Sequence, residues 1–259
     1  MTSDFDGSRT FKDFTPRASL AWKPNNDHNI YFSFSQGFKG GGFDPRGQTT
    51  ATPDFNRDGV RSADEIFEFL SFDPEQVTTY EIGWKASLFD RRLTLALAGF
   101  RSNYSDVQIP GSVGFDSNGD GVNDSFVGIT SNAGRARLYG VELEGNAKLA
   151  RDFAGADTKA DLSWTLGYID AEYQEFIDAF GNDVADQRTF QNTPKWTASS
   201  TLTLATPLKL LSDGDLSLAN TVSYRSSTSQ FETPNPFLDQ PGYILWNASL
   251  VWTSQSGGV

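Results

Sequence analysis

The sequence predicts an all-β chain, an antiparallel up-and-down sheet that forms an open arc of a transmembrane β-barrel. Three observations favour this fold class. Apolar and polar residues alternate with a period of two along about nine segments. The connections between these segments alternate between short and long, as the periplasmic turns and extracellular loops of outer-membrane barrels do. Several segments reach roughly ten residues, the length that a tilted membrane-spanning strand requires.

Each expected strand carries one apolar and one polar face. Between residues 80 and 88, Tyr80, Ile82 and Trp84 alternate with Glu81 and Lys85. The polar face suits a water-filled lumen and the apolar face suits lipid. In chain order, the expected strands are centred on residues 18–22, 30–34, 80–88, 93–97, 139–147, 162–168, 196–204, 216–224 and 244–252.

The connections divide into two classes by length. The short ones are expected at residues 23–29, 89–91, 151–158 and 208–215. The long ones are expected at residues 39–74, 110–130, 174–193 and 231–242. A soluble sandwich has the same alternation of faces, so periodicity alone does not choose between the two architectures. The asymmetry of the connections favours the barrel.

The composition fits this interpretation and excludes several classes of function. The chain has no Cys and one His, which excludes disulfide scaffolds and Cys-ligated metals and argues against a Ser–His–Asp array. A net charge of -12 argues against a nucleic-acid partner. Mean hydropathy is -0.43 although 14% of residues are aromatic. Trp and Tyr prefer the bilayer interface, and Trp22 and Trp252 each stand beside a short turn, as a girdle requires.

Several phrases, in order along the chain, resemble the barrel of TonB-dependent outer-membrane receptors. Residues 30–45 resemble that family's strand ending in Gly-Phe-Lys-x-Gly-Gly-Phe, and residues 74–88 resemble its Pro-Glu…Tyr-Glu-x-Gly-x-Lys strand. Residues 132–144 resemble its Gly-Val-Glu-x-Glu strand, and residues 243–252 resemble a strand near the end of the barrel. The resemblance implies a location in the Gram-negative outer membrane, surrounded by lipid.

The same resemblance implies a transport function. Such receptors import a scarce small-molecule ligand, such as a ferric siderophore, a cobalamin or a saccharide, with energy from a TonB-type protein acting on a plug domain. Residues 1–259 are expected to be the C-terminal part of the barrel, truncated at both ends, with no signal peptide, no plug domain and no closing strands. No transmembrane helix is expected, because no stretch approaches roughly 18 consecutive apolar residues.

The sharpest local motif is a calcium-loop pattern in the first long connection. Residues 54–65 fit D-x-[DN]-x-[DN]-G-x₅-E, in which side-chain oxygens and one backbone carbonyl surround a hard cation. No clear helix precedes the motif, so a helix–loop–helix EF-hand is not expected. The alternative is that Asp, Asn and Gly simply form turns. The expected ligands are Asp54, Asn56, Asp58, Val60, Ser62 and Glu65.

A second Asp-rich loop follows the same pattern over a shorter length. Val127 stands where the bidentate Glu would be, so this loop is closer to the shorter calcium loops of secreted proteins. Calcium is therefore the one cofactor that the sequence suggests. The expected ligands are Asp116, Asn118, Asp120, Val122 and Asp124.

No catalytic constellation is expected, and an enzymatic function is not predicted. Glu142 and Glu144 share a face of one strand, but in a polar lumen they suit solvation or pairing with cations of a plug or a neighbouring strand. The alternative function is a soluble, secreted β-sandwich or adhesin-like binding module with calcium-stabilised loops.

Overall fold

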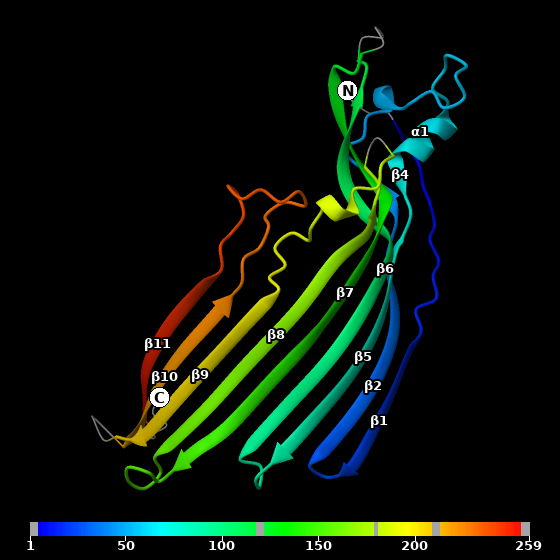
Figure 1. Ribbon diagram of the computed structural model, residues 1–259. Helices are drawn as coiled ribbons and strands as arrows, with labels where there is room; N and C mark the ends of the chain where they lie inside the picture. The colour runs from blue at the N-terminus through cyan, green and yellow to red at the C-terminus, as the bar shows by residue number, and fades with distance from the viewer. Residues whose placement is uncertain (1–4, 118–121, 179–180, 209–212, 255–259) are drawn as a thin grey trace.

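Nine strands of the protein form one antiparallel sheet, and their order across the sheet follows their order along the chain (Figure 1). The computed structural model describes residues 5–117, 122–178, 181–208 and 213–254. Each strand pairs with its neighbours in up-and-down order, and β1 and β11 form the two edges. The strands are β1 (Arg17–Asn25), β2 (His28–Lys39), β5 (Glu75–Leu88), β6 (Leu93–Phe115), β7 (Ser125–Arg151), β8 (Lys159–Phe176), β9 (Trp196–Pro207), β10 (Gly214–Arg225) and β11 (Tyr243–Ser254).

The remaining elements lie in the connections. Between β2 and β5 the chain forms β3 (Gly42–Phe43), η1 (Thr49–Ala51), α1 (Ala63–Leu70) and β4 (Ser71–Phe72), and β3 pairs with β4. A second 3₁₀ turn, η2 (Ala185–Gln187), lies between β8 and β9. Within the described residues, no helix is long and apolar enough to cross a membrane.

The register places the apolar faces of all nine strands on the same side of the sheet. Strand pairing is set by the period-two pattern, because a one-residue slip would turn every apolar side chain to the polar face. One row of directly paired residues crosses the whole sheet and contains only apolar side chains. Its members are Trp22, Ile30, Trp84, Leu97, Leu143, Leu166, Ala198, Tyr224 and Ile244.

This apolar face is open, which distinguishes the fold from a soluble sandwich. Ile82 is 60% exposed, Trp246 69% and Leu250 66%, and no second sheet packs on them among the described residues. A sandwich would bury these side chains between two sheets. The soluble-sandwich alternative is therefore wrong, and the exposed face has the pattern of a lipid-facing barrel wall.

The predicted asymmetry of the connections is confirmed, with one correction. The short turns lie together at one end of the sheet and the long connections at the other (Figure 1). The predicted loop at residues 110–130 is wrong, because β6 continues to Phe115 and β7 begins at Ser125. Pro110, Gly111 and Gly114 suggest a loop, but these residues pair with residues 126–130 as an extended hairpin.

Trp252 stands where the girdle hypothesis puts it, beside a short turn. Its indole Nε1 donates to the Leu208 carbonyl at 2.9 Å, so the polar end of the ring meets the turn backbone. Trp22, three residues before the end of β1, is 62% exposed. Both aromatic rings therefore lie at the margin of the apolar face, as an interfacial position requires.

Candidate functional site

The β6–β7 hairpin rises beyond the other strands and is the support on which the long connections pack (Figure 1). The ladder is interrupted by bulges between Tyr104 and Gln108, where Asp106 has a φ of 54°. Bulges increase twist and bend a strand, so the upper hairpin departs from the direction of the wall. Residues 40–74 cover one of its faces, and residues 177–178, Arg188 and residues 232–233 lie along the other.

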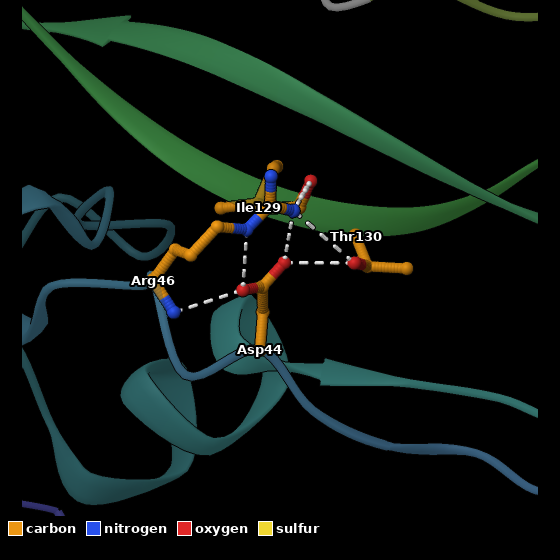
Figure 2. Close-up of polar contacts among 4 residues, drawn as sticks. All are labelled: Asp44, Arg46, Ile129 and Thr130. Atoms are coloured by element: carbon orange, nitrogen blue, oxygen red, sulfur yellow. Dashed lines mark hydrogen bonds and ion pairs between the residues drawn. The ribbon is translucent and has the colours of Figure 1, made fainter.

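A buried carboxylate attaches the β2–β5 connection to the hairpin (Figure 2). The Asp44 side chain is only 2% exposed. Arg46 donates to it from Nε at 3.0 Å, from NH2 at 2.7 Å and from its backbone N–H at 2.9 Å. The Thr130 hydroxyl of β7 donates to the same carboxylate at 2.7 Å, so the attachment joins residues 86 positions apart in sequence.

Charge and space both favour this attachment. Burial raises the pKa of Asp44, but hydrogen bonds from Arg46 and Thr130 outweigh burial and hold the pKa below its usual value. The pKa of Arg46 is raised, chiefly by its hydrogen bonds to Asp44. A Cβ at Gly128 would lie 3.1 Å from Arg46 Cβ and 3.3 Å from its Nε. Glycine at this position of β7 therefore lets the arginine lie against the strand.

Two amides complete the joint between the connection and the hairpin. Gln108 is buried at the bulge, and its Nε2 donates to the carbonyls of Gly40 and Asp73, each at 3.0 Å. Asn132 Nδ2 donates to the carbonyls of Asp73 at 2.8 Å and Asp106 at 2.9 Å. Because Gly40 and Asp73 lie at the two ends of the connection and Asp106 lies in β6, the amides fix where the connection leaves and rejoins the wall.

The first predicted calcium loop is ordered by its own side chains. Asp54 Oδ2 accepts from the Gly59 N–H at 2.7 Å, and Asn56 Oδ1 accepts from the Asp58 N–H at 2.9 Å. The Val60 N–H donates to Asp58 Oδ1 at 2.8 Å. The glycine adopts a φ of 85°, in the left-handed region that the sharp turn requires. These side chains are therefore drawn together over one turn.

Glu65, the ligand expected at the twelfth position of the loop, instead caps the start of helix α1. Ser62 is the N-cap of α1, and Glu65 completes a capping box with it. Glu65 Oε2 accepts from the Ser62 N–H at 2.8 Å, and Oε1 accepts from the Asn56 N–H at 3.2 Å. These hydrogen bonds hold the pKa of Glu65 below its usual value. The sequence pattern S-x-x-E was a signal for this helix start that the calcium interpretation passed over.

The second predicted loop is described only in part. Asp124 accepts from the Ser117 N–H at 2.9 Å and its hydroxyl at 3.0 Å, and these bonds lower its pKa. Asn118 and Asp120 lie outside the described residues, between Asp116 and Val122. Across the described ranges, no three His, Asp or Glu side chains stand close enough together to hold a metal ion. Calcium binding by either loop stays a prediction.

The polar face of the wall holds its own network and a cavity near the short turns. The Tyr31 hydroxyl donates to Glu81 at 2.7 Å, and Lys85 Nζ lies 5.8 Å from the Tyr31 ring centroid. A cavity of about 480 Å³ is bordered by Lys85 and Glu144. The alternation predicts that Glu81, Lys85 and Glu144 share the polar face. The pairing of Glu142 and Glu144 with cations of a plug or a neighbouring strand stays a prediction.

The sequence pattern does not single out the residues of the hairpin attachment, Asp44, Arg46 and Thr130, or the charged residues Arg188 and Glu232. Arg188 and Glu232 border a second cavity, on the hairpin face away from Asp44. Asp44 and Arg46 stand two residues apart in a Gly-rich connection, which gives no local sign of burial. Their role depends on contact with β7, and the same is true of the charged residues in the other connections.

Taken together, a one-sided apolar sheet, short turns at one end and packed connections at the other define the wall of a transmembrane β-barrel. The sequence matches the family described as TonB dependent receptor-like, beta-barrel over residues 2–256. The chain therefore belongs to the TonB-dependent receptor β-barrel family, whose members lie in the Gram-negative outer membrane.

Solved structures share the fold at low sequence identity. The ferric yersiniabactin uptake receptor FyuA from Yersinia pestis matches with a TM-score of 0.60 at 20% identity, over 91% of this chain and 29% of that one. The ferric preacinetobactin receptor BauA from Acinetobacter baumannii matches with a TM-score of 0.60 at 20% identity, over 93% and 29%. The copper transporter OprC matches with a TM-score of 0.53 at 14% identity, over 89% and 30%. This chain thus spans less than a third of the length of these proteins.

Proposed function

We propose that this chain is the ligand-facing barrel wall of a receptor that imports a scarce small molecule across the outer membrane. The observation that carries the proposal is the family match over residues 2–256 together with an uninterrupted apolar row across nine strands. The family is one of transport receptors, and the proposal assigns no catalytic step to the chain.

The proposed ligand class is a ferric chelate of the siderophore type. Two of the structures with a similar fold are described as receptors for ferric yersiniabactin and ferric preacinetobactin, which supports this class over a cobalamin or a saccharide. The copper transporter among them indicates that the fold also serves other cargo. The energy would come from a TonB-type protein acting on a plug within the barrel.

The two ends of the wall suit different roles, ligand recognition at the long connections and contact with a plug nearer the short turns. The connections packed on the β6–β7 hairpin form a polar, hydrogen-bonded layer that suits recognition of a ligand arriving from outside the cell. The polar face below, with Glu81, Lys85 and Glu144, suits contact with a plug. Loops held on a rigid support are the usual place for recognition residues.

We further propose, as a separate matter, that residues 54–65 bind calcium. The turn already gathers the side chains of Asp54, Asn56 and Asp58. Binding would require the Glu65 carboxylate to leave its capping bonds and turn toward the ion. Calcium would then stiffen the connection next to the hairpin.

Uptake by cells tests the transport proposal. Cells that carry or lack the receptor gene would be grown under iron limitation and given radioiron-labelled hydroxamate and catecholate chelates, with radiolabelled cyanocobalamin as a comparison. We expect the gene to be required for uptake of at least one iron chelate, and a protonophore to abolish that uptake. Equal uptake of both chelates with and without the gene, or uptake that resists the protonophore, would contradict the proposal.

A further inference from the structure

A cavity of about 640 Å³ lies on the face of the β6–β7 hairpin opposite Asp44. The hairpin presents Thr130 toward Asp44, and its neighbours in the ladder, Ile129 and Ser131, point the other way and border the cavity. The volume falls within the roughly 300–1,000 Å³ of small-molecule sites. Its lining includes the apolar side chains of Ile109, Ile129 and Phe176 and the charged side chains of Asp178, Arg188 and Glu232.

Two connections form the far wall and are bound to each other. The Thr189 N–H donates to the Glu232 carbonyl at 2.8 Å, and the Asn192 N–H donates to the Ser229 carbonyl at 2.9 Å. Arg225 also donates from NH2 to the Asn192 carbonyl at 2.8 Å. The β8–β9 and β10–β11 connections are therefore one unit at this point, so the cavity has a defined wall.

Arg188 is held in place without using up its donors. Its NH1 donates to the Thr233 hydroxyl at 2.8 Å, and its guanidinium carbon lies 5.2 Å from the centroid of the Phe176 ring. A guanidinium has five N–H donors in a planar fork. The contacts with Thr233 and Phe176 fix its plane, which leaves the rest of the fork available to an anionic oxygen at the cavity.

Glu232 is a half-buried carboxylate at the same cavity, with the charge opposite to that of Arg188. Among the described residues, no N–H or hydroxyl donates to its carboxylate, and the Arg188 guanidinium lies beyond ion-pair distance of it. Burial raises the pKa of Glu232 above its usual value, and the charge of Arg188 counters this only in part. A ligand that supplies an N–H or an ammonium would give this half-buried carboxylate a charge-assisted hydrogen bond.

The cavity thus has one guanidinium, that of Arg188, and two carboxylates, those of Glu232 and Asp178, beside an apolar and aromatic wall. The Asp178 carboxylate already accepts from the Asn182 N–H at 2.9 Å, so Glu232 is the acidic group that we assign to the ligand. The complementary ligand has a carboxylate or similar anionic oxygen, an ammonium group, and an apolar portion that lies against Ile109 and Phe176. A ligand with only one charge would leave either Arg188 or Glu232 without its partner, which gives the site a means of selection.

We propose that this cavity binds a small zwitterionic, amphipathic molecule of amino-acid or short-peptide character, with Arg188 taking its carboxylate and Glu232 its ammonium. This ligand goes beyond the iron chelate of the proposed function, and the inference rests on that function only in assuming that these connections face the outside of the cell. Binding can be measured on the purified receptor without transport. Failure of this proposal is therefore separate from failure of the uptake proposal.

The probe is Nε-dansyl-lysine, which combines a free carboxylate, a free ammonium and an apolar fluorophore. Its fluorescence anisotropy would be titrated with the whole receptor in detergent micelles, against micelles alone. Dansylglycine, which lacks the ammonium, and dansylcadaverine, which lacks the carboxylate, complete the set. The variants are Arg188→Gln and Glu232→Gln, and Glu68→Gln in the exposed face of α1 is the matched control.

We expect both cavity variants to weaken binding of Nε-dansyl-lysine by at least roughly tenfold, which is about 1.4 kcal/mol. Glu68→Gln should bind as the unmodified receptor does. Glu232→Gln should leave the weaker binding of dansylglycine unchanged, and Arg188→Gln should leave that of dansylcadaverine unchanged. The proposal is overturned if anisotropy does not rise above that of micelles, if both variants bind normally, or if a variant loses all three probes alike.

Discussion

Arg46→Ala should release the β2–β5 connection from the hairpin while leaving the wall intact. The substitution removes two side-chain hydrogen bonds, from Nε at 3.0 Å and NH2 at 2.7 Å, to a carboxylate that is 2% exposed. Asp44 keeps only the Arg46 backbone N–H and the Thr130 hydroxyl. A buried charge is thereby left with half of its donors.

The expected cost lies between two limits. Breaking a fully buried ion pair costs about 3–5 kcal/mol, and an exposed pair is worth about 0–1 kcal/mol. Asp44 matches the first limit, but the Arg46 side chain is 50% exposed and water replaces part of what it donates. We therefore expect about 2 kcal/mol, which corresponds to a roughly 30-fold rise in the opening equilibrium of the connection.

Hydrogen exchange measured by mass spectrometry on the whole receptor in micelles would report this opening. The informative amides are those of Asp44, bonded to the Leu70 carbonyl at 2.9 Å, and Gly47, bonded to the Asp44 carbonyl at 3.1 Å. Arg135→Ala is the matched control, because its ion pair with Glu175 is exposed. That change should raise exchange of its own segment by less than roughly fivefold.

Either of two exchange patterns would contradict this prediction. If Arg46→Ala left exchange of residues 41–73 as slow as in the unmodified receptor, the Asp44 attachment would not hold the connection. If Arg135→Ala accelerated residues 41–73 as much as Arg46→Ala does, the effect would not be specific to the buried carboxylate. Thr130→Val gives a second check, since it removes one donor and should cost about 1 kcal/mol.

Three further predictions concern the wall, the acid behaviour of the attachment and the calcium loop. Leu166→Arg on the apolar face should destabilise the barrel by about 2–4 kcal/mol, whereas Thr165→Arg, its neighbour on the polar face, should have little effect. Denaturant unfolding in micelles measures both free energies. Equal costs for the two variants would contradict the assigned faces. Because the pKa of Asp44 is lowered in the folded state, its contribution is complete above its unfolded value of about 4 and is lost as pH falls below it. After correction for intrinsic rates, hydrogen exchange of residues 41–73 should therefore be unaffected between about pH 5 and 8 and should accelerate only below about pH 4. Acceleration near pH 6 would rule out Asp44 as the cause. Isothermal calorimetry should detect heat when Ca²⁺ is added to the unmodified receptor and to the control Glu68→Gln, and this heat should disappear in Asp58→Ala. Absence of heat in the unmodified receptor would contradict the calcium proposal.

The sequence pattern predicts the faces of the strands correctly but not the full length of β6 and β7. The alternation of Ile82 and Trp84 with Glu81 and Lys85 assigns a face to each residue without knowledge of its neighbours, and the structure confirms it. Residues 110–115 were predicted as loop, because proline and glycine weaken strands. Their extended form depends on pairing with β7, which no local pattern encodes.

Apart from the upper parts of β6 and β7, the local sequence pattern is enough to predict the strands, their two faces and the lipid-facing character of one face. These are local properties, since a period of two follows from the geometry of an extended backbone. The contact between Asp44 and Thr130, 86 residues apart, and the shared cavity of Arg188 and Glu232 depend instead on how the chain packs in three dimensions. The reason is that burial and charge pairing depend on which segments pack against the hairpin, and distant parts of the chain determine that packing.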